Sequence, residues 1–457
     1  METTIAAIST AMSASGIGIV RISGEDAMEV ISRIYRSKGG KKRIKEVPSH
    51  TIHYGYIYDG EELIDEVLVM IMRAPRTFTG EDTVEIDCHG GVFAMKRVLE
   101  TVLKNGAEIA GPGEFTKRAF LNGRMDLSQA EAVMDVIQAK NEYALRSSID
   151  QLKGSVQKAI CDIREKIIYH IAYIESALDD PEHISLDGYP QELLEVVDNE
   201  QKEVKRLLKT SSDGKMIQEG IQTVILGKPN AGKSSLLNLL IGENRAIVTD
   251  IAGTTRDILE EYITLHGISL KIIDTAGIRE TKDIVEKIGV DRAREMAQKA
   301  DLILYVVDSS VPLDENDEEI MEMLTGKKAI ILYNKTDLQP EIQPEILKEK
   351  TGHPVIPISA KEEKGITELE EQIKDMFFGG EISFNDEVYI TNARHKAALE
   401  EADRSLDLVR NSIERGMPED FFSIDLMNAY ENLGKILGES VGEDLVNEIF
   451  SKFCMGK

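Results

Sequence analysis

The chain has 457 residues, which corresponds to about three domains of roughly 150 residues each. Its 54 Lys and Arg residues against 81 Asp and Glu residues give a formal charge of -27, which excludes a polybasic nucleic-acid binder. The three cysteines show neither a disulfide framework nor a zinc-ligand spacing. Because no segment reaches 18 apolar residues and no secretory leader is readable, we expect a globular cytoplasmic protein without a membrane span.

The first part of the chain, from Thr3 to about Gly113, predicts a small mixed α/β domain. Apolar runs at Ile5–Ile8, Ile17–Ile22 and Val67–Ile71 are broken by Gly, Pro and Asp-Gly signals. The segment Arg36–Lys45 carries six basic residues in ten. It contains no aromatic residue on which bases could stack, so we interpret it as a solvated loop rather than a nucleic-acid contact.

A helical region follows, with an apolar stripe at three- and four-residue steps. Ten residues from Leu145 to Leu178 fall on one face of a single predicted helix. Its expected partners lie far away in sequence, in a second stripe from Leu399 to Ile413 and in shorter ones at Leu426–Leu437 and Leu445–Phe453. The acidic stretch Asp179–Pro190 reads as a loop within this helical part.

Between these helical segments the pattern changes to alternating strands and helices, typical of a doubly wound sheet. We therefore expect an α/β domain inserted into a helical domain, at a point where the chain ends of the insert lie close together. The predicted strands are Thr223–Leu226, Tyr262–Leu265, Ser269–Ile273, Leu302–Val307, Ala329–Tyr333 and Val355–Ile358.

The strongest motif is a phosphate-binding loop, Gly227-Lys-Pro-Asn-Ala-Gly-Lys-Ser234, placed between a strand and a helix. Its backbone N–H groups can cradle phosphates, Lys233 can reach the β and γ oxygens, and Ser234 can ligate magnesium. Asp274-Thr-Ala-Gly277 follows at a strand end, where Asp274 can help to hold the magnesium ion.

Two motifs, Asn334-Lys-Thr-Asp337 and Ser359-Ala-Lys361, indicate which nucleotide base is bound. A carboxylate at Asp337 can accept hydrogen bonds from N1–H and the exocyclic amine of guanine, whereas adenine offers neither group there. The ordered motifs together predict a GTP-binding domain. The group that orients the attacking water is not evident, because Ile278 stands where a Ras-type protein has Gln, and five nearby polar residues remain candidates: Arg256, Arg279, Glu280, Asp283 and Glu286.

The sequence resembles the MnmE (TrmE) family of tRNA modification GTPases over nearly its whole length. The resemblance is carried by Thr249–Asp257, Thr79–Asp82, His89–Gly91, Gly113–Asn122 and the terminal Phe453–Lys457. It implies an N-terminal α/β dimerisation and tetrahydrofolate-binding domain (1–120), a helical domain (121–215 and 380–457) and an inserted Ras-like GTPase domain (216–379).

The resemblance also implies a function. Family members act as homodimers with the FAD protein MnmG, in a heterotetramer or larger complex. They install an aminomethyl or carboxymethylaminomethyl group on carbon 5 of the wobble uridine of certain tRNAs, using a 5-formyl- or methylene-type tetrahydrofolate. The implied cofactors include K⁺ and Mg²⁺.

Roles in the GTPase domain are carried over from the family position by position. Asn230, Thr249, Ile251 and Thr254 match the potassium ligands, Ser234 and Thr255 match the magnesium ligands, and Glu286 matches the glutamate that positions the hydrolytic water. The full GTP-binding set is Asn230, Ala231, Gly232, Lys233, Ser234, Ser235, Thr249, Asp250, Ile251, Ala252, Gly253, Thr254, Thr255, Asp274, Thr275, Ala276, Gly277, Asn334, Lys335, Asp337, Ser359 and Ala360.

For folate, the matching positions are Arg21, Glu85, Arg124 and Lys457. One carboxylate for the pterin edge and three cations for the glutamate tail are a suitable set of groups. Cys454 matches a cysteine considered for the modification chemistry, although its apolar flanks favour a packing role. Cys88 and His89, as neighbours in a strand, are expected to point to opposite faces.

Two other functions compete with tRNA modification: a ribosome-assembly GTPase and a purely regulatory GTPase. An assembly factor of this kind needs an appended RNA-binding domain with a basic face. The acidic balance of this chain and its N-terminal α/β domain favour the tRNA modification GTPase.

Overall fold

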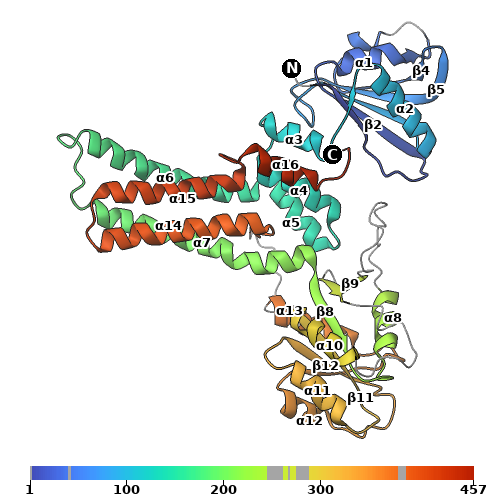
Figure 1. Cartoon of the computed structure of the whole chain (residues 1–457), viewed down its shortest axis with the longest axis vertical. Helices are drawn as coiled ribbons and strands as arrows, with labels where there is room; N and C mark the ends of the chain where they lie inside the picture. Colours follow the sequence, from blue (N-terminus) through green and yellow to red (C-terminus); the bar gives the residue numbers. More distant parts are fainter. Residues whose placement is uncertain are drawn as a thin grey trace. The chain divides into compact units, whose positions relative to one another are not determined.

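The computed structural model describes residues 3–39, 43–243, 261–265, 268–273, 288–378 and 388–456. The chain forms two compact units: Met1–Ile137 with Ser148–Gln201 and Glu401–Lys457, and Gln138–Ser147 with Lys202–Glu400 (Figure 1). Among the described helices, none combines the length and the apolar character that crossing a bilayer requires.

The N-terminal part of the first unit is built on a seven-stranded sheet in the order β3-β4-β5-β6-β2-β1-β7. Neighbouring strands are antiparallel except β1 and β7, which are parallel. The strands are β1 (Ile5–Ile8), β2 (Ile17–Ser23), β3 (Tyr35–Ser37), β4 (Thr51–Asp59), β5 (Glu62–Met72), β6 (Thr83–His89) and β7 (Glu108–Ile109).

Helices α1 (Ala27–Ile34) and α2 (Val92–Lys104) cover one face of this sheet. Alternate strand residues such as Ile57, Val69 and Ile86 are buried beneath them in one apolar core. The next residues along each strand point to the other face, where Ile52 and Leu68 are exposed. The second face is therefore open at β4 and β5, whereas at β1 its residues Ile5 and Ala7 are buried against Phe115.

The basic segment Arg36–Lys45 differs from the predicted solvated loop. Tyr35–Ser37 forms the edge strand β3, and Ile44–Glu46 forms a short 3₁₀ helix, η1. Tyr35 supplies the reason: its ring is buried in the core under α1, and this fixes the start of the segment against β4. Local composition could not reveal that anchor.

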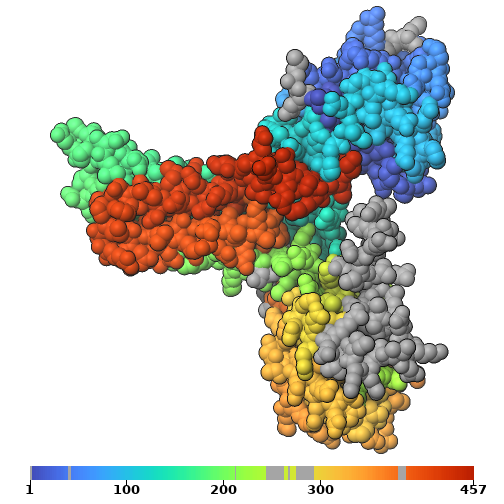
Figure 2. Space-filling model, in the orientation of Figure 1, coloured from blue at the N-terminus to red at the C-terminus, as the bar shows by residue number. Residues whose placement is uncertain are grey.

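The helical part contains α3 (Glu114–Leu121), α4 (Leu127–Gln138), α5 (Glu142–Leu152), α6 (Ser155–Asp179), α7 (Tyr189–Glu219), α14 (Ala393–Glu414), α15 (Glu419–Leu437) and α16 (Glu443–Ser451). Helix α6 packs along α15, a partner that its apolar stripe predicted. Helix α14 makes polar contacts with α7, where Arg410 donates to Asp198 and Gln201. Figure 2 shows the red residues of α16 seated against the cyan residues of α3.

The prediction of one helix through Leu145 and Leu178 was wrong. Gly154 adopts φ +95°, a left-handed conformation that ends α5 and begins α6. Helix α5 then turns another face inward, so Ser148 and Gln151 are buried while Leu145 is 39% exposed. The stripe is buried only within α6, from Val156 to Ile174.

The second unit contains a six-stranded sheet in the order β13-β12-β11-β8-β10-β9. Only β9 is antiparallel to its neighbour. The strands are β8 (Ile221–Leu226), β9 (Glu261–Leu265), β10 (Ile268–Ile272), β11 (Leu302–Asp308), β12 (Ala329–Asn334) and β13 (Val355–Pro357), which confirms the six strands predicted from the sequence.

Helices lie on both faces of this sheet. Helices α8 (Lys233–Glu243) and α13 (Ile366–Phe378) share one core, and α10 (Ile288–Lys299), α11 (Glu315–Met323) and α12 (Pro344–Thr351) share the other. Along β11, Leu304 faces the first core and Tyr305 faces the second. Burial on both faces explains the unbroken apolar runs, and the doubly wound α/β architecture is confirmed.

Candidate functional site

The motifs of the second unit meet at one edge of its sheet. The phosphate loop follows β8, Asp308 ends β11, Asn334 ends β12, and Ser359 lies just after β13. These four strands are parallel, so their carboxyl ends lie at the same edge, which is where doubly wound sheets bind ligands.

The phosphate loop packs tightly against Asn334. Gly232 has φ +104°, and a Cβ at this position would lie 2.1 Å from Asn334 Nδ2, so only glycine fits. Lys233 Nζ donates to the carbonyl oxygens of Gly227 at 2.6 Å and Lys228 at 2.7 Å. Burial lowers the pKa of Lys233, and its ammonium group is held against the loop backbone.

Asn334 joins the phosphate loop to the loop after β13. Its Nδ2 donates to the Ala231 carbonyl at 2.8 Å, and its Oδ1 accepts from the Ala360 N–H at 3.2 Å. The side chain is 2% exposed, so both bonds are shielded from water. One amide therefore fixes the distance between two loops that are far apart in sequence.

The predicted guanine-reading residues also converge. Ser359 Oγ donates to Asp337 Oδ1 at 2.9 Å, which orients the carboxylate. Lys335 adopts φ +66° and its Nζ lies 2.5 Å from Asp308 Oδ2. Asp308 was not among the predicted site residues, although its position directly after the apolar run Leu302–Val307 was a readable signal.

A second feature missed from the sequence is the anchoring of the phosphate loop by Lys228. Its Nζ lies 3.0 Å from Asp314 and 2.7 Å from Asp317, both at the N-terminus of α11. Asp317 Oδ1 also accepts from the buried Tyr305 hydroxyl at 2.7 Å. The loop is thereby tied to α11 and β11 through one buried carboxylate.

Several predicted residues lie outside the described part of the chain. These are the segment Thr249–Thr255, the motif Asp274–Gly277, the proposed water-positioning Glu286, and Lys457. Among the described members of the set, Asn230, Ser234 and Ser235 are exposed on the phosphate loop and the start of α8.

Three of the four predicted folate residues gather in the first unit. Arg21 on β2 lies directly opposite Glu85 on β6 and bonds it at 2.8 Å through Nε. Arg21 also donates to the Gly456 carbonyl at 3.4 Å, which brings the chain terminus to the same place.

An aromatic residue that the sequence reasoning missed links the cations. The guanidinium carbons of Arg21 and Arg124 lie 5.7 and 5.2 Å from the centre of the Phe78 ring. Phe115 adds a second ring, 5.5 Å from Arg21. Both distances to Phe78 are within the range of a cation–π contact. Phe78 directly precedes the Thr79–Asp82 motif, which was the available signal.

The motifs Thr79–Asp82 and Gly113–Asn122 are joined by a buried ion pair. Arg118 contacts Glu81 at 3.2 Å and Glu114 at 2.9 Å. Ser23 donates to Glu81 at 2.7 Å. The Arg118 side chain is 6% exposed, so the network attaches α3 to the sheet.

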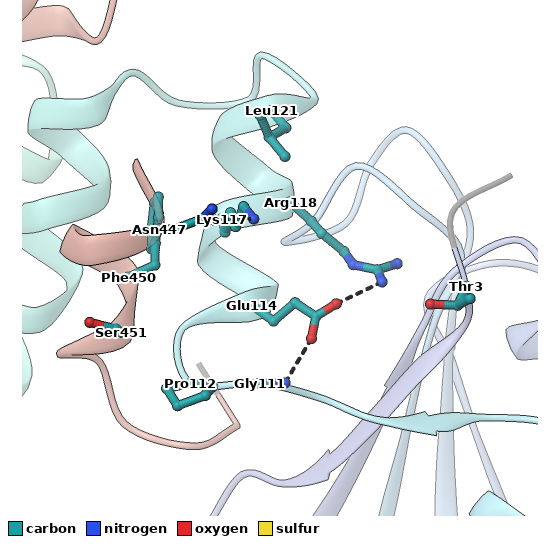
Figure 3. A pocket seen from close by; sticks show the side chains of 10 residues that line it. All are labelled: Thr3, Gly111, Pro112, Glu114, Lys117, Arg118, Leu121, Asn447, Phe450 and Ser451. Atoms are coloured by element: carbon teal, nitrogen blue, oxygen red, sulfur yellow. Dashed lines mark hydrogen bonds and ion pairs between the residues drawn. The ribbon is translucent and has the colours of Figure 1, made fainter. Parts of the chain in front are cut away.

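A pocket of about 510 Å³ opens beside this network (Figure 3). In Figure 3, Glu114 points between the Arg118 guanidinium and the Gly111 N–H, and both bonds are drawn. Its lining comprises Thr3, Gly111, Pro112, Glu114, Lys117, Arg118, Leu121, Asn447, Phe450 and Ser451, and it does not include Arg21, Glu85 or Arg124.

The cysteines divide by burial. Cys88 is buried, and burial together with Asp65 raises the pKa of its thiol to about 11, while the neighbouring His89 is exposed on the other face, as predicted. Cys454 is exposed, so the favoured packing role was wrong. Its backbone carbonyl accepts from the Gly113 N–H at 3.3 Å, which places it at the start of α3.

Two models of known protein families together match nearly the whole chain. A model described as the GTP-binding protein TrmE N-terminus matches residues 4–124, and one described as the MnmE helical domain matches residues 127–454. Among solved structures, the G domain of the T. maritima FeoB iron transporter is 28% identical over 34% of this chain and 97% of its own length, with a TM-score of 0.27, which is too low to support an argument.

Relatives named tRNA modification GTPase MnmE match over the full length. The protein from Lachnoclostridium phytofermentans is 61% identical over 454 residues, covering 99% of both chains. Those from Geobacillus kaustophilus and Bacillus mycoides are each 50% identical over 458 residues, again covering 99% of both chains. The chain therefore belongs to the MnmE (TrmE) family, whose members are GTPases that act in tRNA modification.

Proposed function

We propose that the loops after β8, β11, β12 and β13 bind one GTP molecule, with the residues predicted from the sequence. The observation that carries this proposal is the pair of bonds made by Asn334, to Ala231 at 2.8 Å and to Ala360 at 3.2 Å. A nucleotide spans both loops, its phosphates on one and its base on the other, so their separation must be fixed.

In this proposal Asp337 accepts from the guanine N1–H and exocyclic amine. The hydrogen bond from Ser359 to Asp337 Oδ1 sets the plane of the carboxylate before the base arrives. Lys233 moves from the loop carbonyls to the nucleotide phosphates, where a negatively charged acceptor is stronger than a carbonyl.

Two cations belong to the same proposal. Ser234 and Thr255 would hold Mg²⁺, and Asn230, Thr249, Ile251 and Thr254 would hold K⁺. Asn230 and Ser234 fit these ions because both are exposed on the loop and offer neutral oxygen donors suited to hard cations. When bound, the cations supply positive charge against the charge that develops on the phosphates.

Glu286 is the proposed water-positioning residue. Ile278, next to the Asp274–Gly277 motif, has an apolar side chain that cannot orient a water molecule. A carboxylate can accept a hydrogen bond from a water molecule and so align that water for attack.

We also propose a tetrahydrofolate site at Arg21, Glu85, Arg124 and Lys457. Arg21 contacts Oε1 of Glu85 through both Nε and Nη2, so Oε2 can accept from an amino-pyrimidine edge. Phe78 offers a ring beside two cations, a suitable surface for a flat pterin with an anionic tail. When bound, the folate supplies a one-carbon unit.

The remaining parts of the proposal come from the family. The chain acts as a cytoplasmic homodimer with the FAD protein MnmG and modifies carbon 5 of the wobble uridine of certain tRNAs. Its proposed domains are 1–120, 121–215, 216–379 and 380–457, with residues 216–379 inserted into the helical domain. Cys454, being exposed, stays a candidate for the modification chemistry.

Substitution of Asp337 tests the nucleotide site. In Asp337→Asn the new amide no longer accepts from guanine, so GTP affinity should fall by several kcal/mol, and affinity for xanthosine triphosphate should rise because its position-2 carbonyl accepts from the amide. The matched control is Glu362→Gln, which removes an exposed carboxylate nearby. Equal affinity of Asp337→Asn for the two nucleotides would refute the assignment.

A further inference from the structure

The open face of the N-terminal sheet carries two adjacent rows of cationic and aromatic side chains at its β3 edge. Arg36 on β3 lies opposite Tyr56 on β4. Because side chains alternate along a strand, Tyr54, Tyr56 and Tyr58 share this face, and Lys38 continues the row that Arg36 begins.

The two rows contact each other directly. The guanidinium carbon of Arg36 lies 4.1 Å from the centre of the Tyr58 ring, and Lys38 Nζ lies 4.8 Å from that of Tyr54. The Tyr54 and Tyr56 rings are 6.1 Å apart and tilted by 54°. Arg36 and Lys38 are exposed, and Tyr54 is 39% exposed, so the charges and one ring face solvent.

This arrangement reverses the sequence interpretation of the basic segment. The sequence predicts a plain solvated loop there because the segment has no aromatic residue of its own. The structure brings three tyrosines from β4 beside two of its cations. In a chain of net charge -27, residues 30–45 contain no Asp or Glu at all, so this edge is a local exception to the acidic surface.

We propose that these five residues, Arg36, Lys38, Tyr54, Tyr56 and Tyr58, form a contact surface for tRNA. Phosphates would pair with the Arg36 and Lys38 heads, and an unpaired base of a tRNA loop would stack on Tyr54. Cations beside stacking rings are the combination by which proteins hold single-stranded nucleic acid. The inference rests on the tRNA modification activity of the family and is independent of the proposed potassium and folate sites.

Neighbouring acidic groups limit the affinity of this surface for tRNA. Glu61 contacts Arg36 at 3.3 Å, and its side chain is 93% exposed. Glu66 lies opposite Tyr56 on β5 and is also exposed. Both carboxylates repel phosphates, so removing one should strengthen binding rather than weaken it.

The test measures binding of an unmodified tRNA transcript to the full chain at several salt concentrations. In Arg36→Gln/Lys38→Gln, affinity should fall at least tenfold, and the slope of log affinity against log salt should decrease by about 1 to 1.5. Glu61→Gln should raise both affinity and slope. The matched charge control is Lys96→Gln/Lys104→Gln, which removes two exposed cations from α2 on the other side of the sheet.

The stacking contribution is tested separately. Tyr54→Leu keeps apolar bulk but removes the ring, so affinity should fall about fivefold or more with the salt slope unchanged. Phe93→Ala, at an 86% exposed ring on α2, is the aromatic control and should bind as wild type does. Photo-crosslinking of wild-type protein to thiouridine-containing tRNA should label the peptide 51–59, a readout that needs no variant.

Three results would overturn the proposal. One is unchanged tRNA affinity in the Arg36/Lys38 double variant. Another is an equal loss in the α2 control, which would mean that only overall charge matters. The third is dissociation of a dimer in Tyr54→Leu, seen by sedimentation, with tRNA affinity intact, which would assign this face to a second copy of the chain. GTP hydrolysis without tRNA should be unaffected in all variants, so failure here leaves the nucleotide site untouched.

Discussion

Lys228 Nζ lies 2.7 Å from Asp317 Oδ2, and the Asp317 side chain is only 1% exposed. Lys228 is the second residue of the phosphate loop, while Asp317 lies in the first turn of α11 and accepts the Asp314 N–H at 3.0 Å in a capping box. A buried carboxylate needs a cation, and here the nucleotide loop supplies it. The conformation of the loop is therefore coupled to a helix that carries none of the predicted nucleotide ligands.

Substitution of Lys228 should weaken both folding and nucleotide binding. Lys228→Met leaves Asp317 charged and unpaired, so the free energy of unfolding should fall by about 3 to 5 kcal/mol and GDP affinity should fall with it. Lys228→Arg should retain both, whereas adding Asp317→Asn to Lys228→Met should recover stability, because no unpaired charge remains, but not GDP affinity, because the loop is still not tied to α11. Denaturant unfolding and a GDP titration measure the two effects.

The control for this experiment is the exposed pair between Glu318 on α11 and Lys350 on α12, at 3.4 Å. Lys350→Met should change stability by less than about 1 kcal/mol and leave GDP affinity unchanged. A Lys228→Met protein with wild-type GDP affinity would show that the anchor has no effect on the loop.

Arg118 should contribute strongly to the stability of the first unit. Arg118→Met leaves Glu81, whose side chain is 15% exposed, without its ion-pair partner. It should therefore lower the free energy of unfolding by about 3 kcal/mol or more. Arg97→Met breaks the exposed pair with Glu62 and should cost less than about 1 kcal/mol. Equal losses in the two variants, measured by chemical denaturation, would contradict a special role for the buried pair.

Asp135 on α4 should make stability depend on pH. Burial, and then the charge of Glu131, raises the pKa of Asp135 from 3.8 to about 6. Its charged form is therefore disfavoured by folding, so stability is fully present below about pH 4 and is lost as the pH rises through about 6. Asp135→Asn avoids this loss.

The expected gain for Asp135→Asn is about 1 to 3 kcal/mol at pH 8, vanishing near pH 4. Melting temperatures across this range measure it, with Asp162→Asn on the exposed side of α6 as the control. A pH-independent difference between wild type and Asp135→Asn would rule out the titration of this carboxyl as its source.

Asn230 should determine the response of hydrolysis to monovalent cations. If its side-chain oxygen holds K⁺, turnover of wild type should be fast in potassium and slow in sodium, whose smaller radius suits the oxygen cage poorly. Asn230→Ala should remove the difference, while Asn238→Ala, an exposed amide on α8, should preserve it. Phosphate release in the two salts measures this, and indifference of wild type to the cation would remove the proposed site.

The nucleotide site was largely readable from the sequence because its chemistry is local. A phosphate loop needs consecutive residues with set backbone angles, and the base-reading tetrad follows a single strand. The order of these motifs predicted the doubly wound sheet, whose strands are buried on both faces and so appear as unbroken apolar runs. The structure confirmed each of the six strands within one or two residues at their ends.

Other features depended on contacts between residues far apart in sequence. The apolar stripe from Leu145 to Leu178 predicted one helix, but periodicity cannot detect the left-handed turn at Gly154. The pairing of Lys228 with Asp317 joins positions 89 residues apart in the numbering, and the contact of Phe78 with Arg124 joins positions 46 residues apart.

The basic segment shows most clearly what the sequence determined and what only the tertiary structure decided. The sequence by itself fixed the charge of Arg36–Lys45, which any fold must place in solvent. It could not say which side chains would surround that charge, because β4 begins at Thr51, well after β3 ends at Ser37, and the two strands pair through backbone hydrogen bonds and the burial of Tyr35. Strand register placed three tyrosines beside the cations, since alternate residues of paired strands share a face.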